Sequence, residues 1–459
     1  MNLYDAYGRE VDLARLHEEQ AAPTMSGVRN IYSSMHPSVG LTPERLTQIL
    51  REAEFGDPFL YLELAEEMEE KDLHYLAVLS TRKEAVSQIE FEIKPASAAR
   101  DDVRAAELVR AMLADDGLGL ASAMIDILDA IGKGFSATEI VWDSSEREWF
   151  PRRLRWRDPR WFLFDWVSGE ELLVRTLSAE GSQIPVTGEA PHGSHFKRAG
   201  LYGGLRGGIG IQPLTEPLLP YKFIVHIAKA KSGLPIRGGL ARAAGWSYLF
   251  KNYVLKDWVT FAEVFGQPLR VGKYGPGATE QDKQALLQAV ANIGTDAAAI
   301  MPESMVIEFT EARQSGNAAL YQSMCAYLDA QVSKAVLGQT LTTEIPQGAG
   351  SRAAAEVHDT VRGDIMSADA RRLAATLNRD LIRPIVDLNL GPRKNYPRIV
   401  LGIADDTDAA DFVDIVSKLA DRGVRIGQKT VLDRLGIAPP LADESVMQPN
   451  RAAVSVTDS

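Results

Sequence analysis

Hydrophobic residues recur at helical spacing along two stretches of the chain, one on each side of a short polar loop. Between residues 321 and 336 the apolar positions fall every three or four residues, which places them on one face of a helix that Gly338 ends. After the loop GQTLTTEIPQGAG (residues 338–350), Ser351 is a candidate N-cap, and a second helical pattern runs to Pro384. The pattern predicts two long helices joined by a polar loop.

The second of these helices would be roughly 50 Å long, at about 1.5 Å per residue. A helix of that length favours packing on copies of itself or crossing an assembly. A long helix within a monomeric domain is the alternative.

The N-terminal part of the chain is predicted to be helical. Thr42 followed by Pro43 is a start signal for a helix, and Asp57 with Pro58 repeats it ahead of one longer helix through residues 60–86. Residues before position 42 form a short helical pattern and a loop.

The middle of the chain alternates between strand and helix patterns. Residues 89–94 alternate apolar and charged side chains, as a half-buried strand does, and two helices follow. Further strands are predicted at FSATEIVW, WFPRRLRW, RWFLFDW, ELLVRT and KFIVHIA, between residues 135 and 228.

Helical spacing returns at residues 241–265, where Gly266 and Pro268 end the pattern. A small unit follows, with strands at PLRVGKY, AAAIM and MVIEFTEA and a helix from Thr279 to about Ile293. The tail after Asp405 holds one helix, DFVDIVSKLADRG, and a short helical piece, and its last dozen residues are expected to be disordered.

Composition narrows the class of protein. The chain has 459 residues and a formal net charge of -12, which argues against a protein that coats nucleic acid. Its single cysteine, Cys325, excludes an intramolecular disulfide and fits a reducing compartment. No apolar run has transmembrane length, and the charged start is unlike a signal peptide, so we expect a protein of the cytosol or of an assembly formed there.

The segment from 147 to 162 is the strongest candidate for contact with nucleic acid, because arginines alternate with aromatic residues. Arginines can contact phosphates, and aromatic rings can stack on bases. The same alternation is produced by a strand with solvated arginines and buried aromatics, and we favour this structural or subunit-interface interpretation. The six arginines are Arg147, Arg152, Arg153, Arg155, Arg157 and Arg160.

Candidate sites for nucleotides and for covalent catalysis are weak. The glycines of residues 203–210 lack the preceding strand of a dinucleotide fingerprint, and residues 132–134 lack the rest of a phosphate-binding loop. Ser80 and Lys83 match the S-x-x-K spacing of a serine hydrolase, but no S-D-N triplet accompanies them, and Arg82 to Glu84 read as a charged helix face.

The remaining reactive side chains are also ambiguous. His192 and His195 could bind a metal, but no third ligand is near in the sequence, and a solvated loop is the simpler interpretation. Cys325 falls on the apolar face of its helix, which suggests a core thiol. We therefore predict no enzyme activity, cofactor or metal.

Several phrases of the sequence resemble portal proteins of Mu-like tailed bacteriophages and prophages, from about residue 25 to 440. These phrases are HYLAVLSTRKEAV (74–86), GFSATEIVW (134–142), LFKNYVLKDWVTFAEVFGQPLRVGKY (249–274), SKAVLGQTLTTE (333–344) and GSRAAAEVHDTVRGDI (350–365).

The resemblance implies an α+β portal fold with a mixed α/β wing, a helical stem pair, a small α/β clip and a helical C-terminal region. The parts would be an N-terminal arm (1–55), the wing (56–240), a stem helix (241–265), the clip (266–315), a second stem helix (316–337), a tunnel loop (338–350), a long helix returning to the wing or crown (351–404), and a C-terminal helical region with a disordered tail (405–459).

The family also implies a ring of about twelve copies at one vertex of the capsid, assembled in the host cytoplasm. Double-stranded DNA would pass through its channel without sequence-specific contact. The large terminase subunit, the major capsid or scaffold protein and a head–tail adaptor would be its partners, and no membrane is involved. An adaptor or minor capsid protein without a channel is the alternative.

In such a ring the tunnel loop narrows the channel. The residues expected to contact DNA are Gln339, Thr340, Thr342, Thr343, Glu344 and Gln347. Because the loop carries hydroxyls and one carboxylate but no Lys or Arg, we expect it to touch DNA weakly.

Overall fold

The computed structural model describes residues 3–24, 29–32, 35–114, 116–145, 148–176, 214–265, 269–292, 306–310, 317–340, 352–402, 406–424, 427 and 431–432. The chain divides into a larger unit, Met1–Leu401, and a smaller one, Gly402–Ser459. Helices and small sheets are mixed, which confirms the predicted α+β class.

Two three-stranded antiparallel sheets form the β part of the larger unit. The first has the order β3-β2-β7, with β2 at Phe135–Ser144, β3 at Trp149–Arg157 and β7 at Phe223–Ile227. The second has the order β4-β5-β6, at Phe162–Phe164, Leu172–Thr176 and Leu214–Pro217. All five strands predicted between residues 135 and 228 are present, and β6 is an addition.

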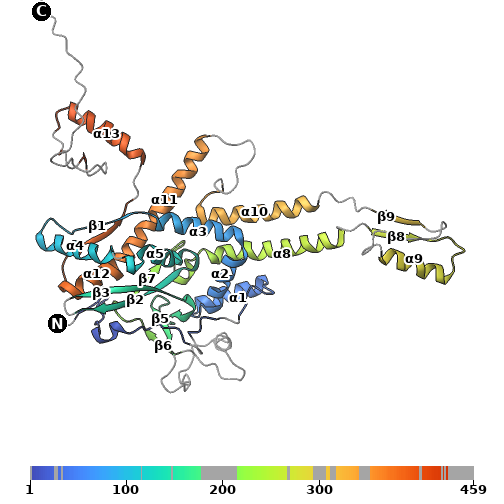
Figure 1. Cartoon of the computed structure of the whole chain (residues 1–459), viewed down its shortest axis with the longest axis horizontal. Coiled ribbons are helices and arrows are strands. Elements are labelled where there is room, and N and C mark those ends of the chain that lie inside the picture. The colour runs from blue at the N-terminus through green and yellow to red at the C-terminus, as the bar shows by residue number, and fades with distance from the viewer. Residues whose placement is uncertain are drawn as a thin grey trace, which may run out of the picture. The chain divides into compact units, whose positions relative to one another are not determined.

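Every residue of β2 from Phe135 to Ile140 is buried, because helices cover the sheet in which β2 is the central strand. The covering helices include α5 (Leu120–Leu128) and the short α6 (Ala130–Lys133), both of which contact β2. Figure 1 shows this sheet beneath the helices of the larger unit.

Helix α1 (Pro43–Glu54) begins as predicted, with the Thr42 side chain accepting a hydrogen bond from the Arg45 backbone N–H. The single helix predicted over residues 60–86 is wrong. The chain forms α2 (Phe59–Lys71) and α3 (Leu73–Ser87), because Asp72 leaves the helical conformation and caps α3 through the N–H groups of His74 and Tyr75.

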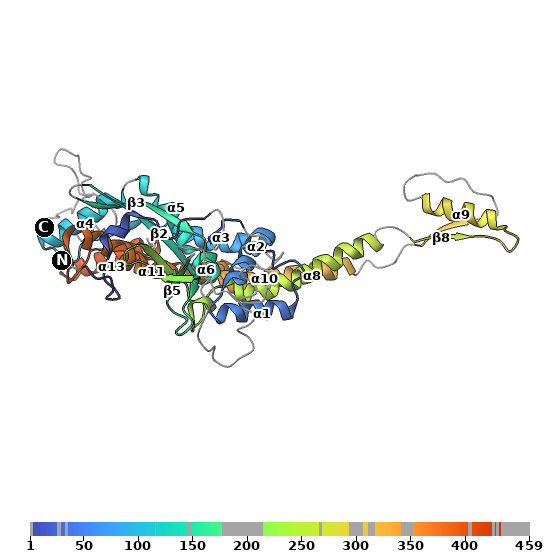
Figure 2. The ribbon, with the colours of Figure 1, turned by 90° about the horizontal axis from the view of Figure 1, so that it is seen from below.

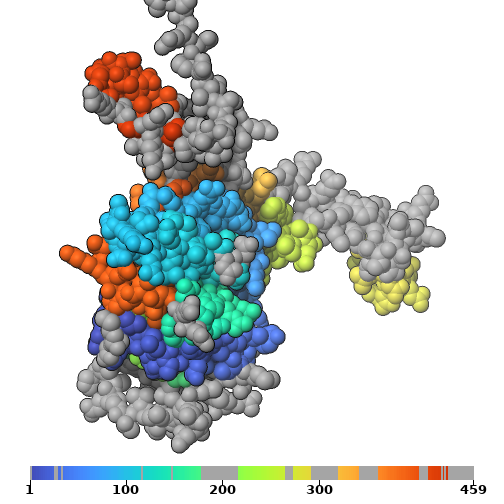
Figure 3. All heavy atoms as spheres, turned by 60° about the vertical axis from the view of Figure 1, so that its left-hand side comes forward, coloured from blue at the N-terminus to red at the C-terminus, as the bar shows by residue number. Residues whose placement is uncertain are grey.

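The N-terminal residues pack on the larger unit. The side chain of Leu16 is buried in the core, and the backbone N–H groups of Gln20 and Ala21 donate to the buried carboxylate of Glu139 at 2.5 and 3.1 Å. Figure 3 shows these dark-blue residues lying along the body of the unit.

Strand β1 (Phe91–Lys94) pairs antiparallel with β10 (Arg398–Leu401), so the strand predicted near residue 89 is confirmed. Helix α4 (Arg100–Leu113) follows β1 and contacts it.

The predicted long helix is longer than expected. Helix α11 (Arg352–Leu377) continues without a break into a π-helical turn, Asn378–Ile382, and then into α12 (Arg383–Leu390). Pro384 was predicted to end the helix, which is wrong. The π turn just before it widens the backbone where proline would otherwise clash with the preceding turn.

The C-terminal half of this helix is core. Leu373, Leu377, Leu381 and Ile385 are fully buried, which supports the monomeric-domain alternative for this half. Ser351 itself lies outside the described residues.

The small unit predicted between the two stem helices contains β8 (Leu269–Lys273), α9 (Glu280–Asn292) and β9 (Val306–Thr310). β8 and β9 pair antiparallel, and Gly272 lies so close to Leu286 of α9 that an added Cβ would be 2.9 Å from its Cγ. The stretch AAAIM, Gly266 and Pro268 fall outside the described residues.

The C-terminal unit, Gly402–Ser459, contains α13 (Asp406–Asp421), which matches the helix predicted in the tail. The last dozen residues lie outside the described residues.

Candidate functional site

Two antiparallel helices form the predicted stem pair: α8 (Ala241–Phe265) and α10 (Asn317–Leu337). They lie side by side in both Figure 1 and Figure 2. The ring of Trp258 stacks on that of Tyr321, with centroids 6.3 Å apart and planes at 12°, and Phe261 contacts the same tyrosine at 5.8 Å. These aromatic contacts hold the two helices together toward the ends that meet the small unit.

Charged and polar contacts fix the other end of the stem pair to α3. The Lys251 ammonium of α8 binds Asp329 of α10 at 2.6 Å and Asp72 of α3 at 2.9 Å. His74 of α3 and Ser333 of α10 lie within hydrogen-bond distance, 2.7 Å between Nε2 and Oγ. Asp72 therefore caps α3 and anchors α8 at once.

One arginine links the two helices that flank the predicted tunnel loop in the sequence. Arg82 of α3 donates from Nη1 to the backbone carbonyl of Val336, in the last turn of α10, at 2.6 Å. Its Nε donates to Asp369 of α11 at 2.7 Å. Because Val336 and Asp369 lie on opposite sides of residues 341–350 in the sequence, Arg82 sets the distance between the helices that the loop connects.

Gly338 ends α10, as predicted. Its φ of +70° is a left-handed conformation, and its N–H donates to the Lys334 carbonyl at 3.1 Å. An added Cβ at Gly338 would lie 3.0 Å from Ile365 and 3.1 Å from Val361, so α11 packs closely against this turn.

The predicted DNA-contacting residues divide into two groups. Gln339 is buried, with 2% of its surface exposed, and neither atom of its side-chain amide finds a hydrogen-bond partner in the described chain. Thr340 is half-buried. The other four, Thr342, Thr343, Glu344 and Gln347, lie outside the described residues.

The arginines between 152 and 160 also divide into two groups. Arg152, Arg153 and Arg155 are exposed on β3. Arg157 is buried and pairs with Glu139 at 2.8 Å and with Glu19. Arg160 pairs with Asp158 at 2.5 Å and with Glu63.

The prediction of solvated arginines is wrong for Arg157, which is buried. Arg157 and Arg160 are each committed to two carboxylates, so neither is free for phosphate. Arg147 lies outside the described residues. Arg152 lies 3.5 Å from Asp143 and Arg155 lies 3.9 Å from Glu19, but these pairs are open to solvent. The exposed three can therefore still reach a partner.

Lys83 does not lie on a solvated charged face, so that interpretation is wrong. Its side chain is mostly buried between Glu69 at 3.2 Å and Asp129 at 3.3 Å. The neighbouring Lys133 binds the same Asp129 and, at 2.7 Å, Glu66. Burial alone would lower the pKa of Lys133, but the carboxylates of Asp129, Glu66 and Glu69 raise it.

This buried network of two ammonium and three carboxylate groups ties α2, α3 and the start of α6 together. A lysine engaged by two carboxylates is poorly suited to accept a proton from Ser80, which a serine–lysine hydrolase requires. The arrangement supports a structural role for Lys83.

Cys325 is half-buried, and burial raises the pKa of its thiol, followed by the effect of the nearby Asp329. A thiol of raised pKa is a poor nucleophile at neutral pH. His192 and His195 lie outside the described residues. Within the part of the chain that the structure describes, no three His, Cys, Asp or Glu side chains form a metal site.

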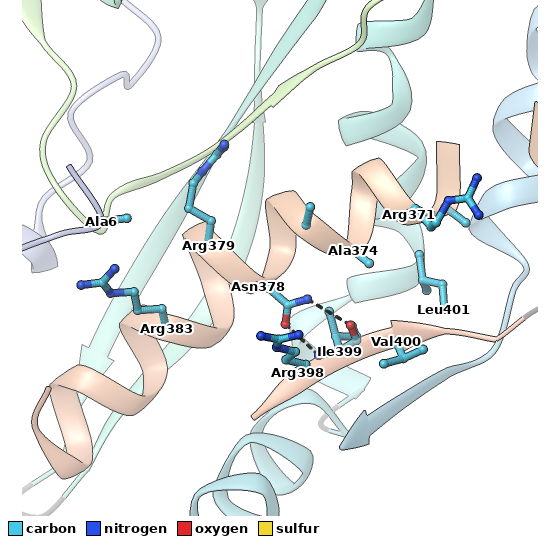
Figure 4. A pocket seen from close by; sticks show the side chains of 12 residues that line it. Ala6, Arg371, Ala374, Asn378, Arg379, Arg383, Arg398, Ile399, Val400 and Leu401 are labelled. Carbon is cyan, nitrogen blue, oxygen red and sulfur yellow. Dashed lines mark hydrogen bonds between the residues drawn. The ribbon is translucent and has the colours of Figure 1, made fainter. Parts of the chain in front are cut away.

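A groove of about 560 Å³ runs between α11, the π turn and β10. Figure 4 shows Arg371 toward one end of it and Arg379 and Arg383 toward the other, with Ala374 between them. The lining residues are Ala6, Ala370, Arg371, Ala374, Ala375, Asn378, Arg379, Arg383, Arg398, Ile399, Val400 and Leu401.

The groove offers positive charge but no side chain that could act as nucleophile or base. Two of its arginines are already paired with carboxylates, Arg379 with Asp380 at 2.6 Å and Arg383 with Asp387 at 3.3 Å. Asn378 closes one side by bonding both the N–H and the carbonyl of Ile399, at 2.8 and 3.0 Å. The groove is therefore a binding surface at most.

The described site consists of a helix pair, an arginine that links α10 to α11, and charge networks, all of which hold helices together. The family model described as the portal protein of Mu bacteriophage matches residues 62–437. The chain belongs to this family, and it is therefore a portal protein and a virion component.

Two curated relatives are similar over most of their length. The Mu-like prophage FluMu protein gp29 of Haemophilus influenzae is 36% identical over 90% of this chain and 73% of its own. The portal protein of Escherichia phage Mu is 35% identical over 90% of this chain and 74% of its own.

Among solved structures, a chain from the neck of an empty gene transfer agent particle, computed with C6 symmetry, has a TM-score of 0.50 and 11% identity. The match covers 87% of this chain and 95% of that chain. At this identity the likeness concerns the fold alone. No described helix is long and apolar enough to cross a membrane.

Proposed function

We propose that copies of this chain form a ring of about twelve at one capsid vertex, with double-stranded DNA passing through the central channel during packaging and ejection. The observation that carries the proposal is membership of the portal-protein family, together with the link that Arg82 makes between α10 and α11, the helices on either side of the polar loop. The loop carries hydroxyls and one carboxylate but no Lys or Arg, which suits a constriction that touches DNA without gripping it.

The wing, stem, clip and crown assignments follow from this proposal. Residues 56–240 form the wing, α8 and α10 the stem, residues 266–315 the clip, and residues 338–350 the tunnel loop. The clip would face the large terminase subunit during packaging and a head–tail adaptor afterwards. The major capsid or scaffold protein would contact the wing, where Arg152, Arg153 and Arg155 are exposed.

The proposed role requires no catalytic residue, cofactor or metal, and assembly takes place in the host cytoplasm. Within the tunnel loop, we assign weak DNA contact to Thr340, Thr342, Thr343, Glu344 and Gln347. Gln339 is buried in the single chain, so its role is to seat the loop base unless the ring exposes it.

A loop deletion tests the channel. Removing Thr340 to Gln347 should leave the ring intact in electron micrographs and reduce packaged or retained DNA. Collapse of the ring would instead show that the loop is structural. A channel-free virion protein would package DNA normally with the deletion.

A charge insertion tests the nature of the contact. Thr342→Lys with Thr343→Lys should slow DNA passage, because each lysine adds a phosphate contact. Asn395→Lys, at an exposed position between α12 and β10, is the matched control and should have no effect. Equal slowing by both variants would contradict a contact specific to the loop.

A further inference from the structure

The stem pair exposes apolar side chains on both helices. On α8 they are Phe250, Tyr253, Leu255 and Val259. Leu255 and Val259 share one side of the helix, and we call these two residues the α8 strip; Val259 is 59% exposed. On α10 they are Leu320, Met324 and Tyr327, the α10 strip, and Tyr327 is 64% exposed. Exposed large apolar residues grouped on one element mark a surface that another molecule covers.

The sequence of α10 supports a protein-covered surface. Residues 317–333 contain a single charged residue, Asp329, and that residue is bound to Lys251. A helix that faces water on its outer side normally carries charged residues there. The outer face of α10 is instead built from apolar and uncharged polar side chains.

The two strips lie on opposite sides of the stem pair. On α8, Trp258 and Phe261 face α10, and the α8 strip is rotated from them by roughly 100° at about 100° per residue. On α10, Tyr321 and Asp329 face α8, and the α10 strip is rotated from them by roughly 130°. The rotation on α8 runs in the direction of increasing residue number, and the rotation on α10 runs against it. Because the helices are right-handed and antiparallel, these opposite senses carry the strips to opposite faces of the pair.

The strips also lie at the same height along the stem. Lys251 pairs with Asp329, and Trp258 stacks on Tyr321. In antiparallel helices, two residues at the same height therefore have numbers that add up to a constant, here about 580. Val259 is therefore level with Leu320, and Leu255 is level with Met324. One face of the stem could meet the opposite face of a neighbour without a large shift along the axis.

We propose that the α8 strip of one copy packs against the α10 strip of the next copy around the ring. This proposal rests on the ring proposed above, and it names the surfaces through which neighbouring copies of the chain meet. Two different faces on opposite sides generate a head-to-tail contact, which repeats around an axis and closes as a ring, whereas a single self-complementary face would give a twofold dimer. The occupant of each strip is thus a second copy of this chain.

Thiol cross-linking tests the pairing. In a Cys325→Ala background, Val259→Cys combined with Leu320→Cys should give a ladder of cross-linked multimers on denaturing gels after a short bismaleimide is added. Either single substitution should stay monomeric, because each strip meets the other strip and not itself. Leu255→Cys with Met324→Cys is the second pair and should behave in the same way.

The outcomes separate the interface from the ring. Rings in micrographs without a ladder from either pair would overturn the interface and leave the ring standing. Dimers from a single-cysteine variant would also overturn it, since they indicate a self-complementary contact. Absence of rings in the unmodified protein would instead refute the proposed function.

Footprinting of the unmodified protein avoids any folding defect of the variants. Tyr327 and Tyr7 are 64% and 65% exposed in the single chain, which makes them a matched pair. In assembled rings, hydroxyl radicals should oxidise Tyr327 and Met324 several-fold more slowly than Tyr7. Equal oxidation of the two tyrosines would overturn the proposal.

Discussion

At the scale of single residues, Asp369 is bound by two arginines in different environments. The Arg82 side chain is 14% exposed and bonds Asp369 at 2.7 Å, whereas Arg372 is 47% exposed and bonds it at 3.1 Å. Arg82→Met should lower the free energy of unfolding by about 3 kcal/mol, since it leaves the buried carboxylate with only the more exposed Arg372 as a partner. Arg372→Met, the same substitution at an exposed pair, should cost less than about 1 kcal/mol. Urea denaturation measures both, and equal losses would contradict the link that Arg82 makes between α10 and α11.

His226 gives the larger unit a dependence on pH. The residue is buried in β7 with Nδ1 2.9 Å from the Thr376 hydroxyl, and burial lowers its pKa to about 4. Asp369 opposes this shift, and Arg379 and Arg372 add to it. The unfolded chain therefore binds a proton between about pH 6.5 and 4 that the folded chain does not, and stability falls as pH falls through this window.

The loss attributable to His226 between pH 7 and pH 5 should be about 2 kcal/mol, at about 1.36 kcal/mol per pKa unit. Other groups also titrate in this range, so the test compares the unmodified protein with His226→Gln. The variant should lose less stability over the same interval. Parallel curves for the two proteins would show that His226 is not the titrating group.

The charge networks were beyond the reach of sequence analysis. Arg82, Arg157 and Lys83 find their partners 287, 18 and 46 residues away. Hydrophobic periodicity does not reveal how the elements that carry these partners pack together. On the sequence, Arg82 and Lys83 fit a solvated helix face as well as a buried one. Only the packing of α3 between α2, α10 and α11 distinguishes these possibilities.

At the scale of elements, hydrophobic spacing predicted most helices and strands, because each of them buries one face in the core. The spacing failed where local chemistry overrode it. The break at Asp72 keeps apolar residues in register across two helices, so it is invisible to periodicity. Pro384 was read as a helix end, but the π turn at Asn378–Ile382 accommodates it.

The turn at Gly338 links the sequence pattern to the proposed site. Gly338→Ala should destabilise the chain by more than about 1 kcal/mol, because the left-handed conformation disfavours alanine and the new Cβ would press on Val361 and Ile365. Gly119→Ala is the matched control, with a φ of +66° and nothing within 4 Å of the added Cβ. Thermal denaturation should show the larger loss for Gly338→Ala, and a larger loss for Gly119→Ala would contradict close packing at the loop base.

At the scale of the whole molecule, the sequence predicted the fold more completely than it predicted the surfaces through which copies assemble. Family resemblance implied a ring, but its contact surface depends on which apolar residues remain exposed after folding. Periodicity placed Tyr321 and Met324 on one stripe, whereas the structure turns Tyr321 toward α8 and leaves Met324 exposed. The exposure of a helix face is a property of the packed chain.

The charge of the chain leads to a prediction about DNA. Each copy carries a formal charge of -12, so the proposed ring of about twelve copies has a large net negative charge that repels phosphate. Proteins that grip DNA with Lys and Arg lose affinity steeply as salt rises, since binding releases counterions. A repelling ring should instead show weak association at low salt that stays level or increases as salt screens the repulsion. The test measures how much linear double-stranded DNA purified rings retain between about 50 and 300 mM salt. The comparison is the ring carrying Thr342→Lys and Thr343→Lys, whose retention of DNA should fall as salt rises. Tight binding by the unmodified ring at low salt, lost as salt rises, would show that the channel holds DNA by its charges.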